Sequence, residues 1–217
     1  MLRLIPGLPA DRPLSVLCLG AHSDDLEIGC GGTVLRLLEE HPGTEVNWVV
    51  FAAEGLRARE AAQSASRFLA AAGRKDVVLN QFRDGFFPYI GAEIKQYFEG
   101  LKTTVSPDLI LTHYRQDLHQ DHRLISELTW NTFRSHLILE YEIVKYDGDV
   151  GTPNFFVHLD GALCRRKVDY ILQCFDSQRG KGWFSEDTFC AMLRLRGVES
   201  NAPDKYAEAF YCRKLVY

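Results

Sequence analysis

LCLGAHSDDLEIGCGGTVLRLLEE, residues 17–40, is the segment from which the architecture of the chain can be predicted. An apolar, strand-like run leads to a histidine, a serine and two aspartates, and a glycine-rich turn then leads into a helical pattern. A strand followed by a helix is the repeating unit of α/β chains. The polar residues His22, Asp24 and Asp25 are therefore expected in the loop where the first strand ends.

The same alternation continues through the first two thirds of the chain. Predicted strands cover residues 14–21, 45–53, 76–82 and 108–114, and predicted helices cover 32–40, 56–73 and 93–105. We expect the second helix to end with Gly73 as its C′ residue. Strands and helices in alternation predict a mostly parallel sheet with helices on both faces, and such sheets bind ligands at the carboxyl ends of their strands.

The pattern changes in the C-terminal third, which we expect to extend the sheet with further strands and helices. Predicted strands cover 137–146, 154–159 and 209–217, and predicted helices cover 161–175 and 186–195. No low-complexity linker or internal repeat divides the sequence. We therefore expect a single domain, residues 1–217.

Composition excludes several classes of protein. The 217 residues, 46% hydrophobic and 25% charged, fit a globular domain with a substantial core. The net charge of -4, without a block of like charge, indicates no nucleic-acid or membrane-surface partner. Residues 1–16 lack the apolar core of a signal peptide, and no run approaches the ~20 apolar residues of a membrane span. Six cysteines without C-x-x-C spacing indicate reduced thiols and a cytoplasmic protein.

A second polar cluster, DLHQDH at 117–122, follows the predicted strand 108–114. The loops after parallel strands open on one edge of the sheet, so this cluster and the first one are expected to meet. Imidazoles and carboxylates suit zinc and related divalent ions, and a hydrolytic site needs about three of them plus an open position. We expect Asp121 to be the N-cap of the following helix, which favours a neutral His122 as metal ligand and leaves His119 freer to carry a proton.

Two motifs resemble those of a known family. AHSDDLEIGCGG (21–32) resembles the A-H-P-D-D-x-x-x-G-x-G-G signature of the LmbE-like, or PIG-L, N-acetylglucosaminyl deacetylases, and HQDH (119–122) resembles their H-x-D-H signature. PDLILTH (107–113) is similar to the strand that leads into the second motif. The resemblance implies a Rossmann-like three-layer α/β fold. It also implies hydrolysis of the acetamide of a small N-acetylated sugar or sugar conjugate, with Zn²⁺ or another divalent metal as cofactor.

The resemblance also assigns roles to residues at matching positions. It implies that three side chains hold the metal: His22, Asp25 and His122. By this resemblance, Asp24 matches the position of the family's general base. His119 matches the position of the residue that stabilises the oxyanion or protonates the amine. Asp121 is expected to orient His119 and support its charge. Arg57 is the candidate for substrate binding, with an ion pair to Glu60 as the alternative.

Several alternatives stay open at this point. The glycines after the first strand suggest a nucleotide-binding domain, but G-x-G-x-x-G would need glycine in place of Val34. The clusters have two other interpretations. One is a metal-binding protein without catalysis. The other is the same fold cleaving the amide of a thiol-sugar or secondary-metabolite conjugate. Residues 177–189 are either a lid or an ordinary surface connection. Whether copies of the chain associate into a homo-oligomer is also open.

Overall fold

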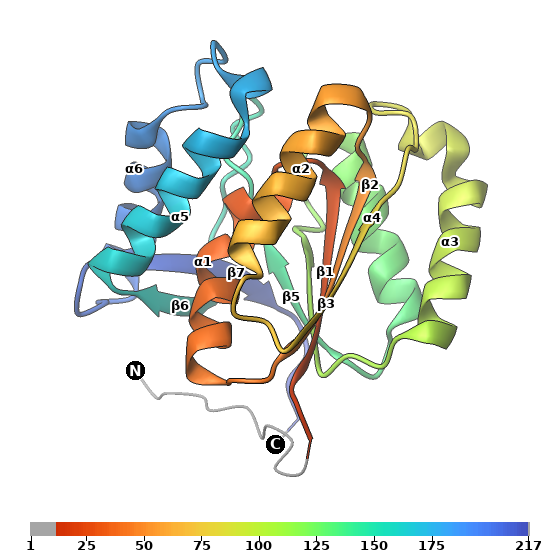
Figure 1. Cartoon of the computed structure of the whole chain (residues 1–217), viewed down its shortest axis with the longest axis horizontal. Coiled ribbons are helices and arrows are strands. Elements are labelled where there is room, and N and C mark those ends of the chain that lie inside the picture. The colour runs from red at the N-terminus through yellow and green to blue at the C-terminus, as the bar shows by residue number, and fades with distance from the viewer. Residues whose placement is uncertain (1–11, 217) are drawn as a thin grey trace.

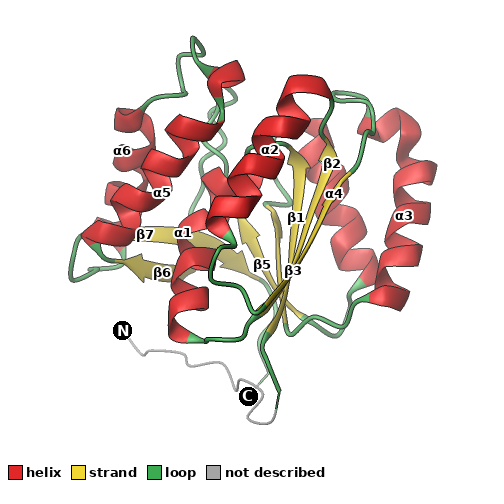
Figure 2. Ribbon diagram, in the orientation of Figure 1, coloured by secondary structure: helices red, strands yellow, loops and turns green. Residues whose placement is uncertain are grey.

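The computed structural model describes residues 12–216, which form a seven-stranded sheet flanked by helices on both faces (Figures 1 and 2). The strands are β1 (Ser15–His22), β2 (Glu45–Ala52), β3 (Arg74–Leu79), β4 (Leu109–His113), β5 (Leu137–Tyr141), β6 (Phe155–Leu159) and β7 (Tyr206–Cys212). The α-helices are α1 (Asp25–Glu40), α2 (Gly55–Phe68), α3 (Gly91–Thr104), α4 (Gln120–Thr132), α5 (Gly161–Cys174) and α6 (Glu186–Glu199), and the 3-10 helices are η1 (Phe87–Ile90) and η2 (Asp176–Gln178). Residues 1–11, on which much of the signal-peptide expectation rests, and Tyr217, the end of the predicted last strand, lie outside the described residues.

The sheet has the order β3-β2-β1-β4-β5-β7-β6. Its first five strands are parallel, whereas β7 runs antiparallel to both β5 and β6. Helices α1, α2 and α5 cover one face and α3 and α4 the other, while α6 packs against β7 (Figure 1). The predicted three-layer α/β fold, extended in the C-terminal third, is therefore confirmed.

The central strands are apolar on both faces because each face is covered by helices. Seven of the eight β1 residues are buried. Val16 and Cys18 pack toward α1 and α2, whereas Leu17 and Leu19 pack toward α3 and α4. Burial on both faces fixes the register of β1 and thereby the position of the polar residues at its carboxyl end.

Helix α1 begins at Asp25, and not after a glycine-rich turn as predicted. The glycines lie inside the helix, where they let it approach its neighbours closely. A Cβ atom on Gly29 would lie 2.2 Å from the ring of Tyr141, and one on Gly31 would lie 2.5 Å from Phe68. The connection between β1 and α1 is consequently short, and it holds the first polar cluster against the end of the strand.

Other predicted boundaries are corrected as well. Helix α2 ends at Phe68, and Gly73 instead packs against the backbone of Gly43, where a Cβ atom would lie 2.5 Å from the carbonyl oxygen. Strand β5 ends at Tyr141, and a loop over residues 142–154 takes the place of the rest of the predicted strand. All six cysteines are free, and none of the described helices is both long and apolar enough to cross a membrane.

Candidate active site

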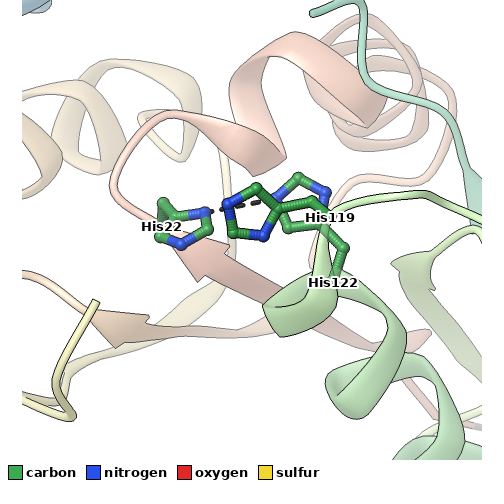
Figure 3. A group of neighbouring side chains, drawn as sticks. All are labelled: His22, His119 and His122. Atoms are coloured by element: carbon green, nitrogen blue, oxygen red, sulfur yellow. Dashed lines mark hydrogen bonds between the residues drawn. The ribbon is translucent and has the colours of Figure 1, made fainter. Parts of the chain in front are cut away.

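The two polar clusters meet at the carboxyl ends of β1 and β4. These strands are adjacent and parallel, so the residues after them lie at the same edge of the sheet. His22 is the last residue of β1, Asp25 begins α1, and His122 lies in the first turn of α4. Figure 3 shows the rings of His22, His119 and His122 gathered at this point. The predicted convergence of the two motifs is therefore observed.

Donor atoms of the three predicted metal ligands face one another. His22 Nδ1 lies 3.1 Å from His122 Nε2 and 3.3 Å from an oxygen of Asp25, and His122 Nε2 lies 3.5 Å from the other Asp25 oxygen. A tetrahedral zinc ion with bonds of about 2.0–2.1 Å separates its ligand atoms by about 3.3 Å. The separations of 3.1 to 3.5 Å are close to this value, with one Asp25 oxygen facing His22 and the other facing His122.

Two further carboxylates fix the tautomers of these histidines. Asp117 Oδ2 lies 2.9 Å from His122 Nδ1, and Asp121 Oδ2 lies 3.3 Å from His22 Nε2. When both rings are neutral and those nitrogens donate to the carboxylates, the facing nitrogens of His22 and His122 present their lone pairs to a cation. Carboxylates behind histidine ligands are typical of metal centres. The donor set therefore fits a divalent cation.

Three other overlapping sets of donor atoms lie within 4.8 Å of one another: His22, His119 and His122; Asp25, His113 and His122; His22, Asp84 and Asp121. Each of them is less suited to a metal. His113 Nε2 already accepts the N–H of Ala21 at 2.9 Å. The set with Asp84 faces the opposite nitrogen of His22, and the Asp84 side chain is 53% exposed. In the remaining set, His119 forms no ion pair with a carboxylate of the described residues, whereas His122 is paired with Asp117.

The charges around the candidate ligands favour neutral His122 and ionised Asp25. Burial and the charge of His113 lower the pKa of His122 to about 4. This agrees with the predicted neutral ligand, although burial is the main cause and not the helix end. Burial raises the pKa of Asp25, but the charges of His122, His113 and His22 outweigh it and hold that pKa well below its usual range. Burial lowers the pKa of His22, and the nearby carboxylates, Asp25 above all, outweigh this and raise it well above the ordinary value.

Asp24 is buried between Asp25 and Arg57. It is the N-cap residue of α1 and is buried, with one oxygen 3.2 Å from Arg57 Nη2. Burial and the charge of Asp25 raise its pKa, and the charges of Arg57 and His22 offset part of this. Arg57 also binds Asp84 at 3.0 Å, so the predicted alternative, a pair with Glu60, is replaced by these contacts. A raised pKa suits a carboxylate that takes a proton near neutral pH.

The expected contact between the Asp121 carboxylate and His119 is replaced by a different one. His119, and not Asp121, is the N-cap of α4, and its Nδ1 accepts the backbone N–H of Asp121 at 3.2 Å. The Asp121 carboxylate instead accepts the N–H groups of Gly85 (2.7 Å) and Phe87 (3.1 Å). Burial and the charge of His22 lower the pKa of His119. His119 is therefore a neutral ring with its hydrogen on Nε2, and Asp121 supports His22.

Sequence reasoning gave no role to Asp117 and Asp84. Asp117 lies within the DLHQDH cluster, five residues before His122, and its contact with that ring depends on how the loop turns. Asp84 lies in the sequence RDGFF (83–87), whose place beside Arg57 depends on the connection after β3. His113, the last residue of β4, stacks on His122 with ring centroids 3.9 Å apart.

Residues 177–189, predicted to be a lid or a surface connection, lead from η2 into the first turn of α6. At the start of this segment the carboxylate of Glu60 accepts the N–H of Ser177 at 2.8 Å. In its middle the N–H of Gly182 donates to the hydroxyl of Tyr146 at 2.9 Å. These contacts place the segment beside α2 and the 142–154 loop. That it closes over substrate as a lid stays a prediction.

Glu27 gives a pH-dependent contribution to stability. It is fully buried in α1 with no ion-pair partner among the described residues, and burial, opposed in part by Ser64, raises its pKa from 4.5 to about 8. The folded chain therefore binds a proton that the unfolded chain releases above pH 4.5, and its free energy of unfolding falls as the pH rises toward 8. Relative to Glu27→Gln, which does not titrate, we expect the wild type to lose roughly 3 kcal/mol between about pH 5 and 8.

Urea unfolding measures the difference in free energy of unfolding between the wild type and Glu27→Gln. Both proteins are unfolded at matched metal content and at several pH values across this range. Stability curves of the two proteins that stay parallel across the range would show that Glu27 does not change its protonation on folding.

Comparison with known proteins gives the family. The model of the PIG-L family, described as GlcNAc-PI de-N-acetylase, matches residues 17–133, which is more than half of the chain. The chain therefore belongs to the PIG-L family. No curated protein sequence matches it.

Solved structures give the fold. The conserved protein TT1542 from Thermus thermophilus superposes with a TM-score of 0.72 at 20% identity, over 94% of this chain and 97% of the other. The N,N'-diacetylchitobiose deacetylase from Pyrococcus horikoshii gives 0.70 at 20% identity, over 92% and 83%. GalB, the 4-carboxy-2-hydroxymuconate hydratase from Pseudomonas putida KT2440, gives 0.74 at 16% identity, over 94% and 98%. Proteins with different reactions share this fold, so the fold alone does not choose the reaction.

Proposed function

We propose that the protein is a metal-dependent hydrolase that removes an N-acetyl group from an amino sugar similar to N-acetylglucosamine. The observation that carries the proposal is the convergence of His22 Nδ1, His122 Nε2 and the Asp25 carboxylate beside a buried Asp24. Structural zinc sites are usually closed by four Cys or His ligands, whereas this set is open and includes a carboxylate. Membership of the PIG-L family and the likeness to a chitobiose deacetylase support the same reaction. The six free cysteines support a reducing compartment such as the cytoplasm.

The residues around the open position divide the work of amide hydrolysis. A Zn²⁺ ion or another divalent cation held by His22, Asp25 and His122 would polarise the acetamide carbonyl and lower the pKa of water to roughly 7. Asp24 takes the proton of the attacking water and later returns it to the departing amine. His119 donates its Nε2–H to the oxygen on which negative charge develops. His119 thus acts as a neutral donor, whereas the sequence led us to expect that it would carry an additional proton and a positive charge.

Arg57 and Asp84 supply the polar contacts of the substrate site. Their side chains pair at 3.0 Å, and 27% of the Arg57 side chain and 53% of the Asp84 side chain are exposed. Together they offer hydrogen-bond donors and acceptors to the hydroxyl groups of a small N-acetylated sugar, next to the general base that Arg57 also contacts.

A second candidate substrate is a sugar conjugate with an apolar group. Large apolar side chains are exposed in the segments that follow β2, β3, β4 and β5, at the edge that holds the site. They are Leu56, Phe86, Tyr89, Leu118, Tyr146 and Val150. Two of them, Phe86 and Tyr89, lie together with ring centroids 5.9 Å apart, and contiguous exposed apolar groups are typical of surfaces that bind an apolar ligand. They favour a conjugate over the free sugar.

Release of acetate from a panel of N-acetyl sugars tests the proposal. The panel pairs free N-acetylhexosamines with their alkyl and aryl glycosides, and includes a thiol-sugar conjugate. We expect zinc-dependent acetate release, about 10-fold more efficient for the apolar glycosides. Stoichiometric zinc binding without acetate release from any compound would support the non-catalytic alternative.

A further inference from the structure

Lys145 lies in the 142–154 loop after β5, outside the part of the chain that the family model matches. Its side chain is only 10% exposed, and its Nζ atom lies 3.0 Å from Asp117 Oδ1. The same ammonium group pairs with the carboxylate of Asp149, which also accepts the N–H of Leu118 at 2.7 Å. A lysine from the C-terminal third is thus held between two carboxylates directly behind the candidate metal centre.

Asp117 is the link between Lys145 and the metal ligands. It is 2% exposed, and its Oδ2 lies 2.9 Å from His122 Nδ1, the nitrogen opposite the one that faces the metal position. Its Oδ1 accepts the N–H of His119 at 2.7 Å in addition to the contact with Lys145. Apart from the ion pair with Lys145, these contacts of the carboxylate are with the His122 ring and with the backbone of the loop that carries Asp117.

A buried carboxylate needs a positive partner to stay charged without a large cost in free energy. His122 does not supply the charge, because a ligand imidazole is neutral. Arg123 is close, but it donates to the backbone carbonyl of Asp117 at 3.0 Å and not to the carboxylate. Among the described residues, Lys145 is the lysine or arginine whose side chain forms an ion pair with the Asp117 carboxylate. The other ion-pair partner of that carboxylate is His122.

We propose that Lys145 is a positioning residue of the metal centre. Its ammonium group holds the Asp117 carboxylate in place, so that Asp117 keeps the His122 ring with Nε2 toward the metal. Asp149 fixes Lys145 from the other side and holds the loop that carries Asp117. The proposal rests on the proposed function, because it assumes that His122 is a ligand, and it assigns part of the metal affinity to a loop beyond the two motifs.

The test is the zinc affinity of Lys145→Met, which keeps the length of the side chain and removes its charge. We expect the dissociation constant for Zn²⁺, measured by competition with a chelator, to rise about 10–100-fold. Turnover at saturating zinc should change much less than the affinity, because the ligands themselves remain. Lys145→Arg keeps the charge and should restore most of the affinity. Lys102→Met, at an exposed pair with Glu99 on α3, is the matched control and should bind zinc as the wild type does.

A double-variant cycle separates this role from a general structural one. Asp117→Asn should weaken zinc binding by itself, and Lys145→Met should cause no further loss in that background. An unchanged affinity in Lys145→Met, or an equal loss with and without Asp117, would overturn the proposal for Lys145. A wild-type protein that binds no zinc would contradict the metal centre itself, which is a different result from either.

Discussion

Asp24→Asn is expected to lower the turnover number for acetate release by about 10²–10⁴-fold while the protein still binds one zinc ion. The amide keeps the size of the side chain and an oxygen that can accept from Arg57, which contacts Asp24 at 3.2 Å. It cannot accept a proton from water. Asp24 is also outside the proposed ligand set, so the metal should stay. Steady-state kinetics and metal analysis of the same preparation measure both effects.

The pH dependence of the rate of acetate release also tests the role of Asp24. Activity requires the ionised carboxylate, so the rate should fall on the acid side as Asp24 becomes protonated. Burial and Asp25 raise its pKa, so this acid limb should lie above the pH at which an ordinary aspartate titrates. Asp147→Asn, an exposed change in the 142–154 loop, is the control and should leave both rate and profile unchanged. Near-normal turnover of Asp24→Asn with zinc retained would assign the base to another residue.

His122→Ala is expected to lose the metal and, with it, about 10³-fold or more in activity. The substitution removes one of three donor atoms and leaves Asp117 without the ring that it orients at 2.9 Å. Metal content after dialysis, together with the rate in added zinc, measures the loss. His41→Ala, at the C-cap of α1, removes a histidine outside the candidate site and should keep both. One tightly bound zinc per chain in His122→Ala would remove His122 from the ligand set.

The sequence was sufficient to bring the two motifs together. His22 and His122 lie at or after the ends of strands whose apolar character predicts burial, and parallel strands have their carboxyl ends at one edge of the sheet. That inference does not depend on the details of the loops. The roles of Gly29 and Gly73 were not predictable, because each depends on a distant neighbour, Tyr141 in one case and Gly43 in the other.

The contacts of the carboxylates required the structure. The N-cap of α4 is His119, whose backbone is extended with φ −72° and ψ 123°. Asp121 is therefore the second residue of the helix, and its carboxylate is turned toward Gly85. The ion pair between Lys145 and Asp117 joins the second motif to a loop that contains no recognisable motif. It could not be predicted because it depends on the path of that loop.

Anomalous diffraction from crystals of the protein grown with Zn²⁺ would show whether a single cation binds between the two motifs. We expect one strong peak per chain, about 2.0–2.2 Å from His22 Nδ1, His122 Nε2 and an oxygen of Asp25, with no fourth side chain completing the coordination. A peak between His22 Nε2, Asp84 and Asp121, or a fourth protein ligand in the open position, would contradict the proposed metal centre.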